Sequence, residues 1–269
     1  MFAREPALPR EPAINIPGLL VAFLLLLLAI QAVRPWLDPE LDLKLVLDGG
    51  FIPARLSLVA GWTTPEELLG RAGEGGGLPT SGLDGALAAY VAGREQAPVP
   101  FVLTYALLHG SWTHVVMNVV WLAAFGAPVV RRCGTLRSLV LAAATAAGAA
   151  AAYWLVDPLG TGIVIGASGI ASGFMGAAAT FVFAPGGSML ARSRGHGDAR
   201  PAGPLGFLRN RNAAVFLALW FLVNIVVGLL GARLGLADGG IAWQAHIGGL
   251  LTGLFLFPLL GVPRPSRRD

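Results

Sequence analysis

Long stretches without a charged residue are the feature that most restricts how this chain can fold. Asp, Glu, Lys and Arg are absent from six segments, which lie between residues 11 and 34, 95 and 131, 137 and 157, 157 and 192, 211 and 233, and 238 and 264. A helix that crosses a bilayer needs about 20 mostly apolar residues, and each segment approaches or exceeds that length. The chain is therefore predicted to be a polytopic membrane protein with six spans.

The composition favours the same class of protein. Hydrophobic residues make up 55% of the chain and charged residues only 13%, whereas an ordinary soluble domain has about 25% charged residues. The net charge of +4 does not indicate nucleic acid as a partner, because the basic residues lie in short segments between apolar stretches, as the positive-inside rule predicts. The single cysteine, Cys133, excludes an intrachain disulfide and a multi-cysteine metal site.

We predict one all-α membrane domain over residues 1–269. Its spans are expected near residues 14–33, 113–130, 138–156, 168–184, 213–231 and 243–260. The first span could instead be a cleaved signal peptide, but it is long for such a segment and lacks a clean small-residue cleavage site. With a cytoplasmic N-terminus, thirteen of the nineteen Lys and Arg residues fall on the cytoplasmic side. Both termini are therefore expected there.

The extracytoplasmic loop, residues 34–100, is too long to be a simple connection. The run Thr64-Pro65-Glu66-Glu67 has a capping threonine, a proline at the first helical position and a glutamate at the third, which is a helix-start signal. After a glycine-rich break, a second helical stretch is predicted around residues 84–91. We expect two short helices in the outer membrane interface; the alternative is a loosely ordered loop.

Small residues are concentrated in the third, fourth and sixth spans. The fourth contains Gly166, Gly169, Gly173 and Gly176, and the sixth contains Gly248, Gly249 and Gly253. In lipid, small residues let helix backbones approach closely. The fourth span is therefore predicted to be a short central helix that others surround.

Ser168 opens this fourth span within Gly166-Ala167-Ser168-Gly169. A serine at a helix start is often only an N-cap. Here, however, the flanking glycines permit close approach of another group, and the helix N-terminus offers free N–H donors to developing negative charge. The residue two positions later is Ile170, where the nucleophile elbow of soluble hydrolases has glycine, so that family does not fit.

His246 lies in the sixth span, three and seven residues before Gly249 and Gly253. All three share one helix face, which could lie against the glycines of the fourth span. An ionisable residue within a span is costly and indicates function. The alternative is a structural histidine bonded to a backbone carbonyl.

His114 and Asn118 in the second span are four residues apart and point the same way. An Asn side chain can donate to an oxyanion, although a polar clamp between helices is the alternative. Metal binding is a weaker third reading, because no H-E-x-x-H is present and His109, His114 and His246 lack a carboxylate partner within the spans.

Taken together, three motifs resemble the rhomboid family of intramembrane serine proteases over roughly residues 100–260. They are His114-x-x-x-Asn118, Gly166-x-Ser168-Gly169 and Ala245-His246-x-x-Gly249-x-x-x-Gly253. The resemblance implies a six-helix bundle in which Ser168 is the nucleophile and His246 the general base, without a third acidic member. It also implies an oxyanion hole formed by His114, Asn118 and the Ser168 backbone N–H, and no metal or cofactor.

The resemblance further implies that the partners are transmembrane protein substrates, cut within membrane lipid. They would enter between the second and fifth spans, where the bulky gate candidates are Met117, Phe216, Trp220 and Phe221. The expected location is a bacterial plasma membrane, with the site opening to the extracytoplasmic side.

Two features depart from the family pattern. Many rhomboids have an aromatic residue four positions after the nucleophile, stacked on the catalytic histidine; here it is Ser172, so His246 must be oriented otherwise, for example by that hydroxyl. The family's Trp-Arg pair in the first loop is not recognisable. A non-catalytic relative that binds transmembrane clients is the main alternative, but such members usually lack the serine or the histidine. A transporter would be expected to show internal repeats or charged residues within its spans.

Overall fold

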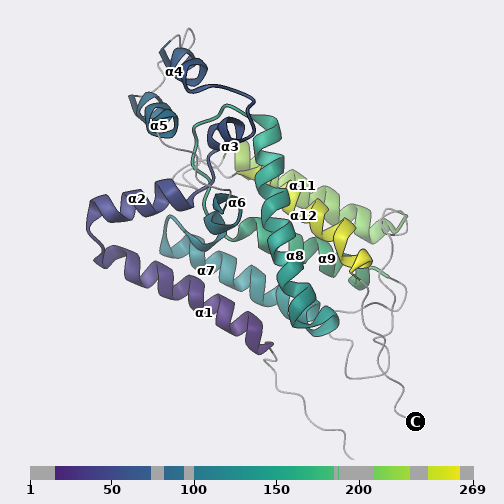
Figure 1. Ribbon diagram of the computed structural model, residues 1–269. Helices are drawn as coiled ribbons and strands as arrows, with labels where there is room; N and C mark the ends of the chain where they lie inside the picture. Colours follow the sequence, from purple (N-terminus) through teal and green to yellow (C-terminus); the bar gives the residue numbers. More distant parts are fainter. Residues whose placement is uncertain are drawn as a thin grey trace, which may run out of the picture.

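The computed structural model describes residues 16–73, 82–93, 100–184, 187, 207, 209–230 and 242–260. These residues form helices, and the only strand-like pairing among them is an isolated antiparallel bridge between Phe51 and Val164. The all-α prediction is therefore confirmed for the described part of the chain (Figure 1).

The N-terminal part forms one apolar helix and four shorter ones. They are α1 (Gly18–Val33), α2 (Pro39–Gly49), α3 (Pro53–Val59), α4 (Pro65–Gly73) and α5 (Gly82–Ala92). In Figure 1, α4 and α5 lie together at the top, apart from the main bundle. The predicted capping box at the start of α4 is present, because the Glu67 N–H donates to Thr64 Oγ1 at 3.2 Å and the Thr64 N–H donates to Glu67 Oε2 at 3.0 Å.

The long loop contains more helix than predicted. Helices α2 and α3 were not expected, although each begins with proline at its first position, where a missing N–H costs nothing. Asp38 also caps α2, since its carboxylate accepts the Glu40 N–H at 2.9 Å.

The predicted second and third spans are joined more tightly than expected. The helices are α6 (Phe101–Thr104), α7 (Trp112–Trp121), a π-helical segment (Leu122–Gly126) and α8 (Ala127–Val156). From Trp112 to Val156 the chain stays helical except at Gly134, where φ is 78° and ψ is 175°. The predicted connection at residues 131–137 is thus a break at a single residue, and glycine is the residue that adopts this positive φ without strain.

Two helical stretches, Gly18–Trp36 and Trp112–Val156, are long and apolar enough to cross a membrane. Ser168–Val182 and Arg211–Val226 are shorter apolar helices. The number of six spans therefore stays a prediction.

The remaining helices are α9 (Ser168–Val182), α11 (Arg211–Leu230) and α12 (Trp243–Leu259). Every residue of α9 from Gly169 to Phe181 is buried, with α8 and α12 packed against it (Figure 1). The prediction that the fourth apolar segment is a short central helix agrees with this packing.

Helices α9 and α12 touch through their backbones. A Cβ atom on Gly249 would collide with the Gly169 carbonyl oxygen, and one on Gly253 with the Gly173 carbonyl oxygen. The two predicted glycine faces are therefore in direct contact, because any side chain at these positions would force the helices apart.

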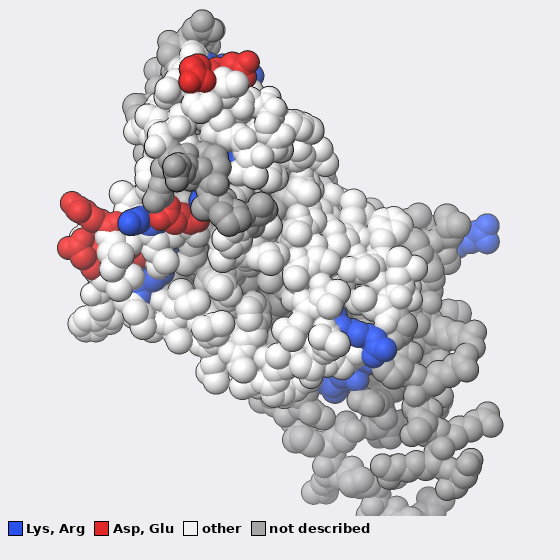
Figure 2. All heavy atoms as spheres, viewed as in Figure 1, with Lys and Arg blue, Asp and Glu red and all other residues white. Residues whose placement is uncertain are grey.

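The surface has the charge distribution of a membrane protein. On the face shown in Figure 2, acidic residues lie at one end only, basic residues lie toward both ends, and a broad uncharged surface lies between. Large apolar side chains are exposed on several helices, among them Leu25 of α1, Val120 of α7 and Leu222 of α11. Soluble monomers rarely expose so many large apolar side chains.

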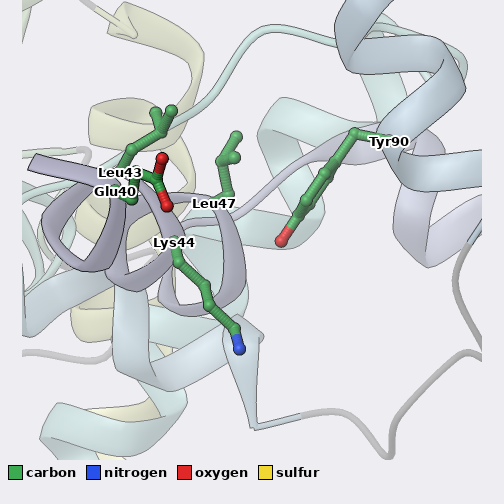
Figure 3. Close-up of a pocket in the computed structure, with 5 residues that line it drawn as sticks. All are labelled: Glu40, Leu43, Lys44, Leu47 and Tyr90. Carbon is green, nitrogen blue, oxygen red and sulfur yellow. The ribbon is translucent and has the colours of Figure 1, made fainter.

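A shallow pocket of about 430 Å³ lies between α2 and α5 (Figure 3). It is lined by Glu40, Leu43, Lys44 and Leu47 of α2 and by Tyr90 of α5. The Tyr90 hydroxyl donates to Asp48 Oδ1 at 2.7 Å and so ties the two helices together. None of the predicted site residues lines this pocket.

The backbone contact between α9 and α12 gives a direct test. Gly253→Ala should lower the free energy of unfolding by about 1–3 kcal/mol, because the added methyl group has no room. Thermal unfolding in detergent measures the effect. Gly70→Ala in α4 is the matched control, since its Cβ would enter open space and alanine is the better helix former. Equal stability of the two variants would contradict the packing.

Candidate active site

Ser168 is the first residue of α9, and backbone hydrogen bonds hold the turn that precedes it. The Gly166 N–H donates to the Tyr105 carbonyl oxygen at 2.9 Å, and the Ala167 N–H donates to His109 Nε2 at 3.2 Å. Gly166 has a φ of 123°, which favours glycine. Ala167 takes the N-cap position, so the alternative that Ser168 only caps the helix does not hold. The N–H groups of the first turn of α9 have no acceptor within the helix.

His109 supports this turn as a hydrogen-bond acceptor. It lies in the segment before α7, and burial, with a smaller contribution from His114, lowers the pKa of its imidazole to about 4. At neutral pH the ring is therefore uncharged, and Nε2 has a lone pair for the Ala167 N–H. The His109 carbonyl oxygen accepts from Arg34, whose guanidinium also binds both carboxylate oxygens of Asp42 at 2.6 and 3.0 Å. The sequence pattern suggested only metal binding for His109.

The long loop also holds the segment that leads to Ser168. Phe51 and Val164 exchange two backbone hydrogen bonds of 2.9 and 2.8 Å. The Ser57 hydroxyl donates to the Pro158 carbonyl oxygen at 2.5 Å and accepts from the Trp154 indole at 2.8 Å. Residues 51–57 thus fix the path of the chain between α8 and α9.

His114 and Asn118 of α7 face the turn from the other side. A Cβ atom on Gly166 would lie 2.7 Å from His114 Nε2 and 3.6 Å from Asn118 Nδ2. The Ser111 hydroxyl caps α7 by accepting the His114 N–H at 3.2 Å. Asn118 Nδ2 donates to the His114 carbonyl oxygen at 3.2 Å. An amide nitrogen has two hydrogens, so one remains for a further acceptor.

His246 lies beside the start of α9 because of the glycine contact. It is one turn before Gly249 on α12, and Gly249 packs on Gly169, the residue after Ser168. Within the described part of the chain, no hydrogen bond joins the Ser168 hydroxyl to His246. The structure therefore brings His114, Asn118, Ser168 and His246 to one end of α9.

The partner of His246 was not predicted. His246 Nδ1 lies 2.7 Å from Oδ1 of Asn224 on α11, and Asn224 Nδ2 donates to the Trp220 carbonyl oxygen at 2.9 Å. The expectation that the Ser172 hydroxyl orients His246 is wrong: Ser172 is buried on α9, and the side-chain partner is Asn224. The alternative that the His246 ring bonds to a backbone carbonyl is also wrong, because Nδ1 has the side chain of Asn224 as its partner. The sequence signal that could have pointed to this partner was Asn224 itself, an amide residue within an apolar stretch of α11.

Three of the four gate candidates lie together. Phe216, Trp220 and Phe221 of α11 pack against a buried cluster that includes Leu250 of α12. Met117 is half exposed on α7 and is not part of that cluster.

Metal ligands do not gather at this site. Where the structure describes the chain, no three His, Cys, Asp or Glu side chains come together as a metal site.

Comparison with known proteins identifies the family. The family model of the Rhomboid domain matches residues 99–262, which is more than half of the chain and includes each described helix from α6 to α12. No curated protein matches the sequence significantly. The matched region contains the turn before Ser168, the α9–α12 contact and both histidines that face that turn. With its long apolar helices, this chain is an integral membrane protein that belongs to the rhomboid family.

Proposed function

We propose that the protein is an intramembrane serine endopeptidase that cleaves transmembrane segments of other membrane proteins. Ser168 is the nucleophile and His246 the general base. The observation that carries this assignment is the packing of Gly249 on Gly169, which sets the histidine beside the helix N-terminus that begins with the serine. Membership of a family whose members are generally intramembrane serine proteases supports it.

The proposed chemistry is acyl transfer. Nε2 of His246 accepts the Ser168 hydroxyl proton while Oγ attacks the substrate carbonyl carbon, and the imidazolium then protonates the leaving amine. A water molecule then gives a proton to His246 and attacks the carbonyl carbon of the acyl-enzyme. The imidazolium returns the proton to Ser168 Oγ, and the acyl product leaves. The absence of a serine–histidine hydrogen bond in the described part of the free protein is compatible with this role, since catalytic contacts often tighten only when substrate binds.

The oxyanion of the tetrahedral intermediate would lie at the start of α9. The Ser168 backbone N–H points out of the first helical turn, and the His114 and Asn118 side chains face the preceding Gly166. Donors fixed in advance around a developing charge lower the barrier because they need no reorganisation during the reaction.

The substrates would be membrane-spanning helices, and they would be reached through lipid. A helix in lipid satisfies its own backbone hydrogen bonds, so it must unwind locally before a peptide bond can reach Ser168. Entry would lie between α7 and α11, beside Met117 and the aromatic cluster of α11.

The orientation that we propose has both termini in the cytoplasm of a bacterial cell and the site opening to the outside. The excess of basic residues on the proposed cytoplasmic side supports it.

Removal of either half of the dyad should abolish cleavage. Ser168→Ala and His246→Ala should each lose several orders of magnitude in kcat, because the two groups act as a unit. Cleavage of a reporter transmembrane segment in detergent measures the loss, and Ser172→Ala, one turn along the same helix, is the matched control. Activity above about one per cent of wild type in both variants would refute the dyad, given the size of such losses.

A variant of Asn118 distinguishes its two possible roles, as an oxyanion donor or as a clamp between helices. Asn118→Ala should lower kcat on the order of 10²-fold while KM and thermal stability stay nearly unchanged. A clamp would instead cost about 0.6–2 kcal/mol of stability. In that case turnover per folded molecule would not change, and Asn118 would have no catalytic role.

Cysteine accessibility tests the orientation. In a Cys133→Ser background, single cysteines at Thr135, Gly197 and Ser266 should react only after the membrane is permeabilised, and one at Asp238 should react in intact cells. The reagent should be a maleimide that does not cross membranes. Labelling at residue 197 in intact cells would show that the orientation is the opposite of the one proposed.

A further inference from the structure

We infer that Asn224 is the positioning residue for the catalytic base: its amide oxygen holds His246 in the tautomer that can accept a proton from Ser168. The inference rests on the proposed function for its catalytic meaning, but its structural basis is independent. Asn224 lies on α11 and His246 on α12, and Oδ1 and Nδ1 are 2.7 Å apart. That distance is short for a hydrogen bond of this type and falls within the normal range.

The direction of this hydrogen bond follows from the other half of the amide. An Asn side chain can present either oxygen or nitrogen to a ring, and the neighbouring groups decide which. Here the carbonyl of Trp220, one turn earlier on the same helix, can only accept, so the Asn224 nitrogen must face it at 2.9 Å. The oxygen is therefore left for His246. An oxygen that can only accept requires hydrogen on Nδ1.

The chemical consequence lies at the other ring nitrogen. A neutral imidazole has one hydrogen, so a hydrogen on Nδ1 leaves Nε2 with the lone pair that a general base needs. The opposite tautomer would have hydrogen on Nε2 and could not accept the serine proton. Proteases with a Cys-His-Asn set show that an amide can orient a catalytic histidine.

A close approach of α11 and α12 makes the bond possible. Gly228 is one turn after Asn224, and a Cβ atom on it would lie 2.5 Å from Cδ1 of Trp243, which is one turn before His246. The glycine therefore lets the Trp243 ring pack on the backbone of α11. The two helices are held together next to the hydrogen bond, and the ring plane of His246 is constrained from the α11 side.

A neutral partner suits this place in the molecule. A carboxylate there would have to lose its hydration within the membrane-spanning bundle, which is costly. The amide supplies the same acceptor oxygen without a charge. The amide nitrogen of Asn224 is also satisfied, because it donates to the Trp220 carbonyl oxygen.

Activity measurements test the inference first. Asn224→Leu should lower kcat by about 10- to 100-fold, which is less than the 10²–10⁴-fold that a general base contributes as a whole. KM and thermal stability should stay close to those of the control Asn212→Leu, an exposed residue in the first turn of α11.

A spectroscopic measurement reports on the bond itself. The chain has only four histidines, so ¹⁵N NMR of histidine-labelled protein in detergent can assign His246 by comparison with His246→Ala. At neutral pH the wild type should show hydrogen on Nδ1 of His246, and Asn224→Leu should show a mixture of tautomers. Measured on Ser168→Ala protein, this result does not depend on proteolysis.

The two readouts separate this inference from the proposed function. If Ser168→Ala and His246→Ala both retain more than about one per cent of wild-type cleavage, the dyad fails. The tautomer of wild-type His246 then still decides whether Asn224 holds the ring. If the dyad stands, unchanged kcat in Asn224→Leu, or a loss that only follows the folded fraction, overturns the inference. Hydrogen on Nε2 in the wild type overturns it even where Asn224→Leu does not fold.

Discussion

Direct contact between the backbones of α9 and α12 is the constraint on which the candidate site depends. Gly249 and Gly253 rest on the carbonyl oxygens of Gly169 and Gly173, so the distance between the two helix axes is set by backbone atoms and not by flexible side chains. His246 is on the same face of α12, one turn away. A catalytic pair that must meet within a fraction of an ångström benefits from a rigid contact of this kind, since small displacements cost much of the rate.

The contact between α9 and α12 does not fix the turn before Ser168, and other parts of the molecule hold that turn in place. One side of the turn before Ser168 is held by Tyr105 and His109, and Arg34 in turn binds the His109 carbonyl oxygen. The path from α8 to this turn is fixed by residues 51–57 of the long loop. The loop is therefore part of the support of the site, although it carries none of the proposed catalytic groups.

Much of this could be predicted from the sequence, because the signals are local. Apolar length predicted the helices, the capping box predicted the start of α4, and the spacing of His246, Gly249 and Gly253 predicted which face of α12 meets α9. The connection at Gly134 was predicted too long, since a single positive φ can end one helix and begin another. The supporting role of His109 depends on contacts between distant segments, which no local pattern specifies.

Asn224 shows most clearly why the other contacts of the site could not be predicted from the sequence. A lone asparagine in an apolar helix can bond to its own backbone, to another helix or to a ligand, and the sequence does not distinguish these. In the structure Asn224 bonds both to the backbone of its own helix and to a residue of another helix. The bond to its own helix determines which atom faces the other helix. Because the Trp220 carbonyl takes the amide nitrogen, the oxygen must turn toward α12. The tautomer of the proposed base then follows from a bond within α11, provided that Gly228 keeps the two helices close enough for the oxygen to reach His246.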